Sequence, residues 1–429
     1  GECDHASKAD LVFVELPFAT AADGSGGSLS VQLLDGIRDI LRVSSNTAPV
    51  MVSISQGTHA GPHDGSSLIE QAMDELLTLR RDNFAIVIGA GNARNMQCHA
   101  QTVIAPNETV ELTLLVPERD STDSFVECWY PRTIGKHDTQ LTVTVKPPGT
   151  SGASAKGEQT RTLERPAMGK AAKANRVAAL IHSKTTSTGT DATFLLALGP
   201  AEAGTAKAST GVPAGQWHLQ LHNQGKKKVR VDCYVERDEP VRPPRQQFPK
   251  FLHRPPSTTG PRHVNPSEDG TLNTLATGRY TIVAKACYRY TGTPSSYSSL
   301  GPTRGGGRTG ALDVWVAADE SPFLPGVRAA AVHSGSSFRM NGTSVAAPTL
   351  ARLLFNAMMD SLANGKAVKR ARWATLINRL ADPKNPSGSL VFRTPRSDLQ
   401  RPAGPAAVAG VGTGSKVGLR GARRTAGSA

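Results

Sequence analysis

Hydrophobic residues in the first hundred positions form two kinds of pattern. Residues 10–16 (DLVFVEL), 50–55 (VMVSIS) and 84–88 (FAIVI) are short runs rich in Val, Ile, Leu and Phe, which are typical of buried strands. Between these runs, residues 28–43 and 64–80 repeat apolar side chains at helical spacing. The order strand, helix, strand, helix, strand predicts an α/β fold with a doubly wound parallel sheet.

The period changes to two after about Cys98. Seven or eight short alternating segments follow one another as far as Arg237, separated by turn-rich stretches and without a long amphipathic helix. This alternation predicts an antiparallel β-sandwich. From Glu236 to Pro266 the sequence then contains eight prolines and six Arg or Lys residues, which is typical of an extended linker.

Strand-like and helical periods return after the Pro-rich stretch. Residues 281–288 and 312–318 predict strands, a long helix is expected after Pro348, and a shorter helix is expected over 368–380. The sandwich is therefore expected to interrupt a split α/β domain. We divide the chain into a first α/β part (1–98), the inserted sandwich (99–238), a Pro-rich linker (239–274), a second α/β part (275–385) and a basic disordered tail (386–429).

Composition narrows the range of partners. The chain has 429 residues, of which 38% are apolar, and no uninterrupted apolar run of the ~18–20 residues that a membrane-spanning helix needs. The net charge of +14 is concentrated in the tail and the linker, and only 5% of residues are aromatic. We therefore expect neither a membrane span nor nucleic-acid binding.

The five cysteines are scattered and form no C-x-x-C pair, so neither a zinc site nor a thioredoxin-type motif is expected. An odd, sparse count also argues against a disulfide framework, although Cys128 and Cys233 could pair within one domain. The chain starts at Gly1 without a basic-then-apolar leader, so either a leader has been removed or the sequence is cut from something longer.

The sharpest local motif is Asn341–Pro348 (NGTSVAAP), directly ahead of the predicted long helix. A serine at a helix N-terminus lies beside free backbone N–H groups, which can stabilise the oxyanion formed when its hydroxyl attacks an acyl carbon. On spacing alone, an N-cap role for Ser344 is favoured over a catalytic one. The segment Gly89-Ala90-Gly91 after a strand suggests dinucleotide binding, but Arg94 occupies the position of the third glycine, so that interpretation fails.

The octapeptide resembles the nucleophile segment G-T-S-x-A-x-P of the subtilisin-like serine proteases (subtilases, peptidase family S8). Residues 52–57 (VSISQG) resemble the substrate-binding strand and loop of that family, and residues 85–92 (AIVIGAGN) resemble the strand that ends in its oxyanion-hole Asn. The resemblance covers roughly residues 8–98 and 275–365. It implies a serine endopeptidase that acts on polypeptides through an acyl-enzyme.

The resemblance also implies roles for individual residues. Ser344 would be the nucleophile, and Asn92 would hold the oxyanion. The residues expected to contact the substrate around the S1 pocket are Ser55, Gln56, Gly57, Gly89, Ala90 and Gly91.

The catalytic Asp and His of the family have no counterpart in this chain. Subtilases carry them upstream of the strand that residues 10–16 match, and none of His5, His59, His63 and His333 lies in an H-G-T-H-type segment. We therefore expect an N-terminally incomplete protease that is inactive by itself. The alternative is a catalytically inactive remnant of the fold that acts as a binding or scaffold protein.

Three further expectations come from the family. Residues 125–149 resemble the jelly-roll insertion of some clostridial and related bacterial subtilases in their Trp followed by a Pro-Pro-Gly turn. No cofactor is expected; calcium occurs in the family, but no site for it is assignable in this sequence. Family analogy suggests secretion, yet the chain itself contains no signal peptide and the compartment stays unassigned.

Overall fold

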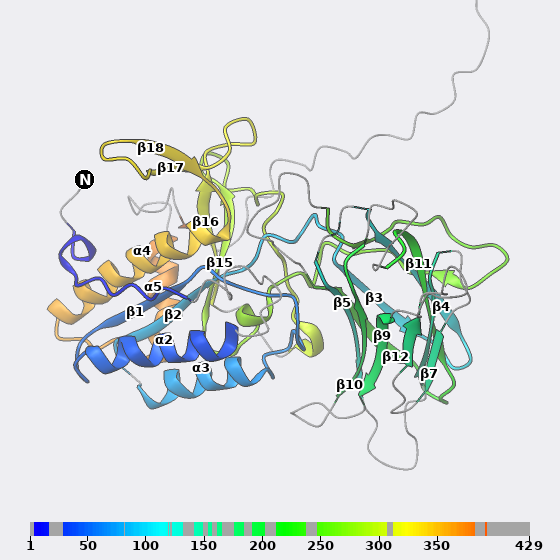
Figure 1. Cartoon of the computed structure of the whole chain (residues 1–429). Helices are drawn as coiled ribbons and strands as arrows, with labels where there is room; N and C mark the ends of the chain where they lie inside the picture. Colours follow the sequence, from blue (N-terminus) through cyan, green and yellow to red (C-terminus); the bar gives the residue numbers. More distant parts are fainter. Residues whose placement is uncertain are drawn as a thin grey trace, which may run out of the picture.

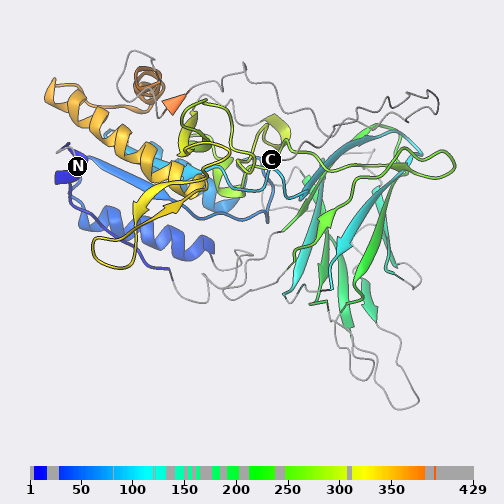
Figure 2. The ribbon, with the colours of Figure 1, turned by 90° about the horizontal axis from the view of Figure 1, so that it is seen from above.

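The computed structural model describes residues 4–16, 29–80, 82–118, 120, 122–131, 141–148, 153–156, 161–164, 176–183, 191–201, 212–236, 247–306, 312–381 and 391–392. Two halves lie side by side, an α/β half and an all-β half, as the two views in Figures 1 and 2 show. None of the described helices is long and apolar enough to cross a membrane.

A five-stranded sheet forms the centre of the α/β half. Its order is β1 (Val50–Ile54), β2 (Phe84–Gly89), β15 (Ile282–Tyr288), β16 (Asp313–Asp319) and β19 (Val391–Phe392). The first four strands are parallel, and β19 runs antiparallel to β16. Because β2 pairs with β15, segments from both sides of the sandwich sequence share one sheet, and the expected parallel α/β architecture is confirmed.

Helices cover both faces of this sheet. α2 (Leu29–Val43) and α3 (Leu68–Leu79) pack against one face, and α4 (Thr343–Ala363) and α5 (Trp373–Leu380) against the other. All six residues of β2 are buried, and successive side chains of this strand contribute to opposite cores. A strand buried on both faces explains the continuous apolar run in the sequence.

Residues 10–16 do not form the predicted buried strand. The segment is extended but belongs to none of the described sheets, and Leu11 and Phe13 are 78% and 86% exposed. It passes over α2, where a Cβ on Gly36 would come within 2.8 Å of Val14 Cγ1. The prediction failed because an apolar run fixes neither a pairing partner nor an edge to receive it.

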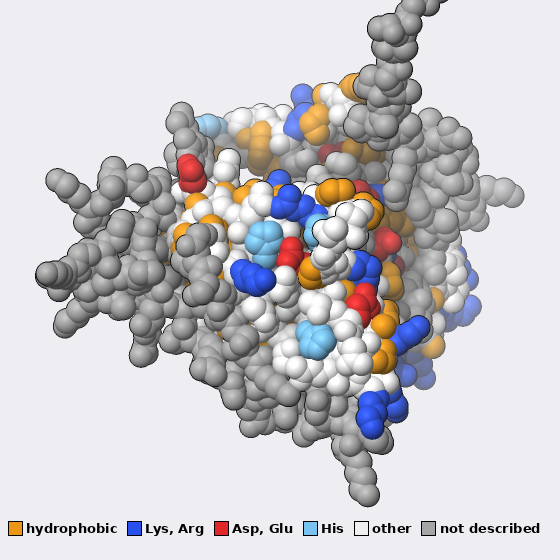
Figure 3. Space-filling view, turned by 90° about the vertical axis from the view of Figure 1, so that its right-hand side faces the viewer, with side chains coloured by type: hydrophobic (Ala, Val, Ile, Leu, Met, Phe, Trp, Pro, Cys, Tyr) orange, Lys and Arg blue, Asp and Glu red, His pale blue; other side chains and the backbone are white. Residues whose placement is uncertain are grey.

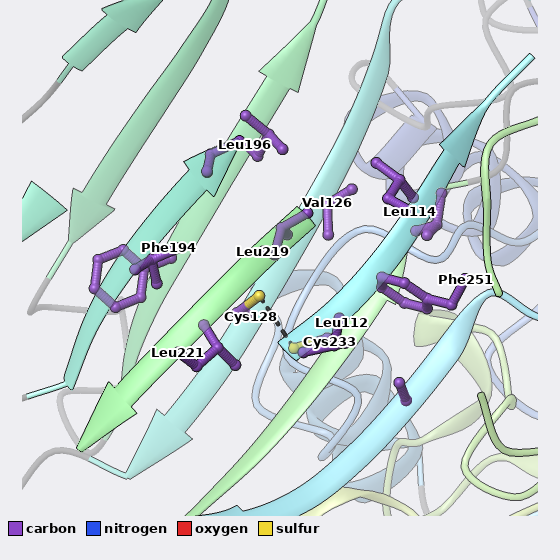
Figure 4. Close-up of a cluster of buried hydrophobic side chains, with 14 of the residues drawn as sticks. Leu112, Leu114, Val126, Cys128, Phe194, Leu196, Leu219, Leu221, Cys233 and Phe251 are labelled. Carbon is purple, nitrogen blue, oxygen red and sulfur yellow. Dashed lines mark hydrogen bonds between the residues drawn. The ribbon is translucent and has the colours of Figure 1, made fainter. Parts of the chain in front are cut away.

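The all-β half consists of two sheets whose inner faces share one apolar core (Figure 4). One has the order β3-β12-β5-β10-β9-β8, the other β13-β4-β11-β6-β7, with β14 also paired to β4. The antiparallel strands predicted from the period of two are thus present, whereas the jelly-roll connectivity stays a prediction. The strands are β3 (His99–Ile104), β4 (Thr109–Val116), β5 (Ser124–Pro131), β6 (Leu141–Lys146), β7 (Ala153–Lys156), β8 (Arg161–Glu164), β9 (Arg176–Ser183), β10 (Asp191–Leu198), β11 (Gly215–Asn223), β12 (Val229–Val235), β13 (Lys250–Phe251) and β14 (Arg262–His263).

The outward positions of the sandwich strands carry both polar and apolar side chains, since Val103 and Ile181 are exposed and Leu195 is half-buried. On the face shown in Figure 3, basic, acidic and histidine side chains lie interspersed over the described surface. Within β10, for example, alternate residues are buried and half-buried along the whole strand.

Part of the predicted Pro-rich linker is built into the sandwich. β13 and β14 both pair with β4, and Phe251 and Val264 are buried in the sandwich core. The chain leaves the sandwich next to the point where it enters, because Ser267 N donates to His99 O at the start of β3 at 2.8 Å. Scattered apolar residues among the prolines therefore anchor this stretch in the sandwich, although its composition predicted an extended linker.

The remaining elements frame α4. A hairpin of β17 (Val327–Ala330) and β18 (Ser337–Met340) precedes that helix, and α4 begins six residues earlier than expected, with Pro348 inside it. β19 lies within the predicted disordered tail and is held there by Val391, which is fully buried; the rest of the tail lies outside the described residues. Short 3-10 turns occur at Ala6–Lys8, Thr274–Ala276, Arg304–Gly306 and Arg370–Arg372.

Candidate functional site

The N-terminus of α4 presents Ser344 to solvent. Gly342 is the N-cap, Thr343 the first helical residue and Ser344 the second, and the Ser344 side chain is exposed. Gly342 has a φ of 109°, and a Cβ there would lie 3.3 Å from Asn92 Nδ2, so the turn favours glycine on both counts. Ser344 is therefore not the helix cap, and the capping interpretation is wrong.

Pro348 and Ser55 together fix the first turn of the helix. Proline has no N–H to donate to the carbonyl four residues earlier, which is that of Ser344. The Ser55 hydroxyl takes this place and donates to Ser344 O at 3.0 Å, while Ser344 Oγ donates in return to Ser55 O at 3.3 Å. The strand end after β1 is thereby tied to the turn that carries Ser344.

Asn92, three residues after the end of β2, binds the same turn. Its Oδ1 accepts from Thr343 N at 2.9 Å and from Thr343 Oγ1 at 3.2 Å. Because a backbone N–H can only donate, the atom facing it must be the amide oxygen, and the Asn92 NH2 group is left on the other side. In the described part of the chain, neither this NH2 group nor the Ser344 N–H has a hydrogen-bond acceptor.

The predicted substrate-contacting residues separate into two groups. Ser55, Gln56 and Gly57 are exposed, whereas Gly89 and Ala90 are buried; Thr343 lies against Gly89, and Asn273 donates to the carbonyls of both. Gly91, which is half-buried, donates its N–H to Thr343 Oγ1 at 3.0 Å. A direct contact of Gly89 or Ala90 with substrate is unsupported, and the roles of the other residues stay predictions.

Asn273 organises this region, and nothing in its sequence context pointed to it. Its Nδ2 donates to Gly89 O at 2.6 Å, and its backbone N donates to Ala90 O at 3.0 Å. A Cβ on Gly57 would come within 2.5 Å of Asn273 Cγ, so the segment after β1 can lie this close to the buried Asn273 only because residue 57 is a glycine.

A buried carboxylate supports the turn from the opposite side. Asp319, at the end of β16, accepts from Tyr297 OH at 2.6 Å, and Tyr297 OH in turn accepts from Gly342 N at 2.8 Å. Asp319 also accepts from Ser295 Oγ and from Gly326 N. Burial and the bond to Asp319 raise the pKa of Tyr297 above its ordinary value, so the phenol remains a donor to Asp319.

None of the described histidines is hydrogen-bonded to Ser344. His59 and His63 are buried between the two halves, where His63 stacks on Tyr234 with ring centroids 3.7 Å apart. Burial lowers the pKa of His63 well below its usual value, and both of its ring nitrogens face backbone carbonyls. His333 is exposed in the loop between β17 and β18, and His5 contacts Asp360 on α4.

The described residues contain no group of three or more His, Cys, Asp or Glu side chains arranged to hold a metal ion. At the start of α4, the geometry offers an exposed Ser344 hydroxyl, the Ser344 N–H and the NH2 group of Asn92, which binds the neighbouring Thr343. Such a group of donors suits a developing negative charge on an oxygen next to Ser344 Oγ.

No protein-family profile matches the chain, and no curated protein matches its sequence. Among solved structures, the CspB protease of Clostridium perfringens has a similar fold, with a TM-score of 0.57 and 18% sequence identity. The fold is thus similar to that of a known protease. The similarity covers 78% of this chain and 61% of that chain, so the chain spans about three-fifths of the length of the protease it matches.

Proposed function

We propose that this chain carries the nucleophile and the oxyanion hole of a subtilisin-like serine endopeptidase. The observation that carries the proposal is an exposed Ser344 hydroxyl on the helix turn that Asn92 binds through Thr343, with the Ser344 N–H and the Asn92 NH2 group lacking acceptors among the described residues. The fold shared with the clostridial protease and the motif NGTSVAAP support the same assignment.

In the proposed reaction, Ser344 Oγ attacks the carbonyl carbon of a peptide bond. The carbonyl oxygen becomes an oxyanion, and Ser344 N–H and Asn92 Nδ2 donate to it. A polypeptide would lie along the exposed Ser55–Gly57 segment, next to the edge strand β1. Donors already fixed in the folded protein need not reorganise as the charge develops, which is the main source of such catalysis.

The hydroxyl proton must also leave. Ser344 Oγ–H points to Ser55 O, and a carbonyl can accept a hydrogen bond but cannot act as the base at neutral pH. The base and its orienting carboxylate would therefore come from groups other than the residues described. Without them, we propose that the chain is a negligible peptidase.

The test is labelling with a fluorophosphonate, which transfers its phosphonyl group to an activated serine. The chain alone is compared with the same chain extended upstream by a segment that carries D-x-G and H-G-T-H motifs. Only the extended form should label, and Ser344→Ala should abolish labelling. Asn92→Ala should slow it about 10²–10³-fold, whereas Ser336→Ala, at an exposed serine of the β17–β18 loop, should have no effect.

A non-catalytic binding role is the second candidate. It is favoured by the mutual bonds between Ser55 and Ser344, which engage the hydroxyl without a base. This role predicts that the extended form also fails to label while a peptide still binds. Labelling of the chain alone that is lost in His59→Ala, His63→Ala or His333→Ala would instead reveal an internal base and contradict the proposed incompleteness.

A further inference from the structure

Two cysteines meet inside the sandwich. Cys128 on β5 and Cys233 on β12 are each 1% exposed, and their sulfur atoms lie 3.1 Å apart (Figure 4). The two residues are direct partners in the antiparallel register of these strands. They lie 105 positions apart in the sequence, so the contact is created by the fold.

The hydrogen-bond pattern shows which kind of cross-strand pair they form. Glu236 N donates to Phe125 O at 2.9 Å, which makes Glu236 and Phe125 a hydrogen-bonded pair of this ladder. Hydrogen-bonded and non-hydrogen-bonded pairs alternate along antiparallel strands, so three positions further Cys233 and Cys128 form a non-hydrogen-bonded pair. Agreement comes from the other edge of β12, where Val235 N donates to Cys98 O.

This geometry suits a covalent link. Cα atoms of a non-hydrogen-bonded pair lie about 4.5 Å apart, with side chains closer than in the alternate pairs. Disulfides need Cα atoms about 4.4–6.8 Å apart and Cβ atoms that face each other. The sheet therefore already holds the two thiols where a bond can form without displacing either strand.

We propose that Cys128 and Cys233 are a modification site, oxidised to an intrachain disulfide by thiol–disulfide exchange with a small-molecule disulfide such as oxidised glutathione. One cysteine thiolate attacks the small disulfide, forms a mixed disulfide and releases one small thiol. The second thiolate attacks the protein-bound sulfur of the mixed disulfide and releases the other small thiol. The two cysteines lose two electrons and two protons, which the small disulfide gains.

The same surroundings set when the exchange takes place. The contact with Cys128 and burial raise the pKa of Cys233 well above its ordinary value, so the native protein holds a protonated, inaccessible thiol. Thiolates are the attacking species, so the bond forms while the strands are assembling and then becomes enclosed in the core. Once closed, it links the second strand of the sandwich sequence in this sheet to the last, across the whole intervening chain.

The two other described cysteines serve as internal controls. Cys98 and Cys287 are also buried, but Cys98 Sγ donates to Ala93 O and Cys287 lies in a separate apolar cluster with Trp315. In the strand registers, Cys287 faces Ala317 and Cys98 O accepts from Val235 N. Burial alone therefore does not distinguish the proposed pair; its cross-strand register does.

The experiment refolds the full chain either with reduced and oxidised glutathione or with dithiothreitol, then alkylates it in denaturant and analyses it by mass spectrometry. Of the five cysteines, three should be alkylated after oxidative refolding and all five after reductive refolding. Peptide mapping should find Cys128 joined to Cys233. The midpoint of thermal unfolding should be several degrees higher for the oxidised form, because the link restricts a long loop in the unfolded chain.

Two variants keep the test decisive. Cys98→Ala/Cys287→Ala should retain the cross-link and leave one alkylated thiol after oxidation. Cys128→Ala/Cys233→Ala should unfold at the same temperature in both buffers. Five alkylated thiols after oxidative refolding, or a cross-link that involves Cys98 instead, would overturn the proposal, and both outcomes can be read from the wild-type chain even if a variant fails to fold.

Discussion

The two halves of the molecule bury different kinds of side chain at their centres. The space between the two sandwich sheets is filled by apolar side chains from alternating positions along the strands, such as Phe194 and Leu219. The carboxyl end of the parallel sheet instead encloses hydrogen-bonded polar residues, among them Asn273, Asp319 and Thr343. The sandwich is thus stabilised by packing, whereas the candidate site depends on polar groups whose energies depend on exact partners and on protonation.

The largest effect should follow from a cavity in the sandwich. Phe194 on β10 is 1% exposed and packs against Tyr130 with ring centroids 5.7 Å apart. Phe194→Ala should lower the free energy of unfolding by about 3–5 kcal/mol, measured by urea denaturation. Thr193→Ala, at the half-buried neighbouring position, should cost far less; equal losses would mean that the core is not the source of sandwich stability.

The second-largest effect is a dependence of stability on pH that arises in the α/β half. Burial raises the pKa of Glu70 on α3 from 4.5 to about 7, against hydrogen bonds from Thr277 and Ser67. The folded chain therefore keeps a proton that the unfolded chain has released between these pH values. The stabilisation is present below about pH 4.5 and is lost as the pH rises through about 7.

Glu70→Gln removes this titration while keeping the size of the side chain. Relative to the variant, the wild type should lose about 3 kcal/mol of unfolding free energy between pH 5 and pH 8. Urea denaturation at several pH values measures the difference. Parallel pH profiles for the two proteins would mean that Glu70 is ionised in the folded state throughout this range.

The smallest of the three effects concerns the support of the nucleophile turn. Asp319 accepts from Ser295, Tyr297 and Gly326, and an Asn at this position would have only one acceptor oxygen for donors that now face both. Asp319→Asn should cost about 1–2 kcal/mol in unfolding free energy. Ser295→Ala, which removes one donor and leaves the carboxylate intact, should cost less; the reverse order would refute the central role of Asp319.

Regular periodicity is the part of this fold that the sequence reveals. The alternation in β10 and the apolar run of β2 specify which side chains are buried, because one strand has one covered face and the other has two. The motif around Ser344 also predicted that Asn92 would approach it, and in the structure Asn92 binds the neighbouring Thr343.

Features that depend on distant partners could not be predicted. Asn273 and Tyr297 act through hydrogen bonds to segments far away in the sequence, and such bonds leave no periodic pattern. The predictions of a buried strand at residues 10–16 and of a linker around Phe251 were wrong for a related reason. The local sequence shows whether a segment is suited to burial. Whether it is buried depends on which element of the fold packs against it.

The neighbouring arrival and departure points of the sandwich have a consequence for the folding of the α/β half. Ala100 forms a β-bridge with Pro266, so the long segment between these two residues begins and ends at the same place in the molecule. For the rest of the chain, this segment is equivalent to one closed loop. The entropic cost of closing a loop grows only slowly with loop length. Replacing a short turn by this long segment therefore adds little to the free-energy cost of folding the α/β half. On this argument, a change in the length of the segment between these two residues should leave the pairing of β2 with β15 intact.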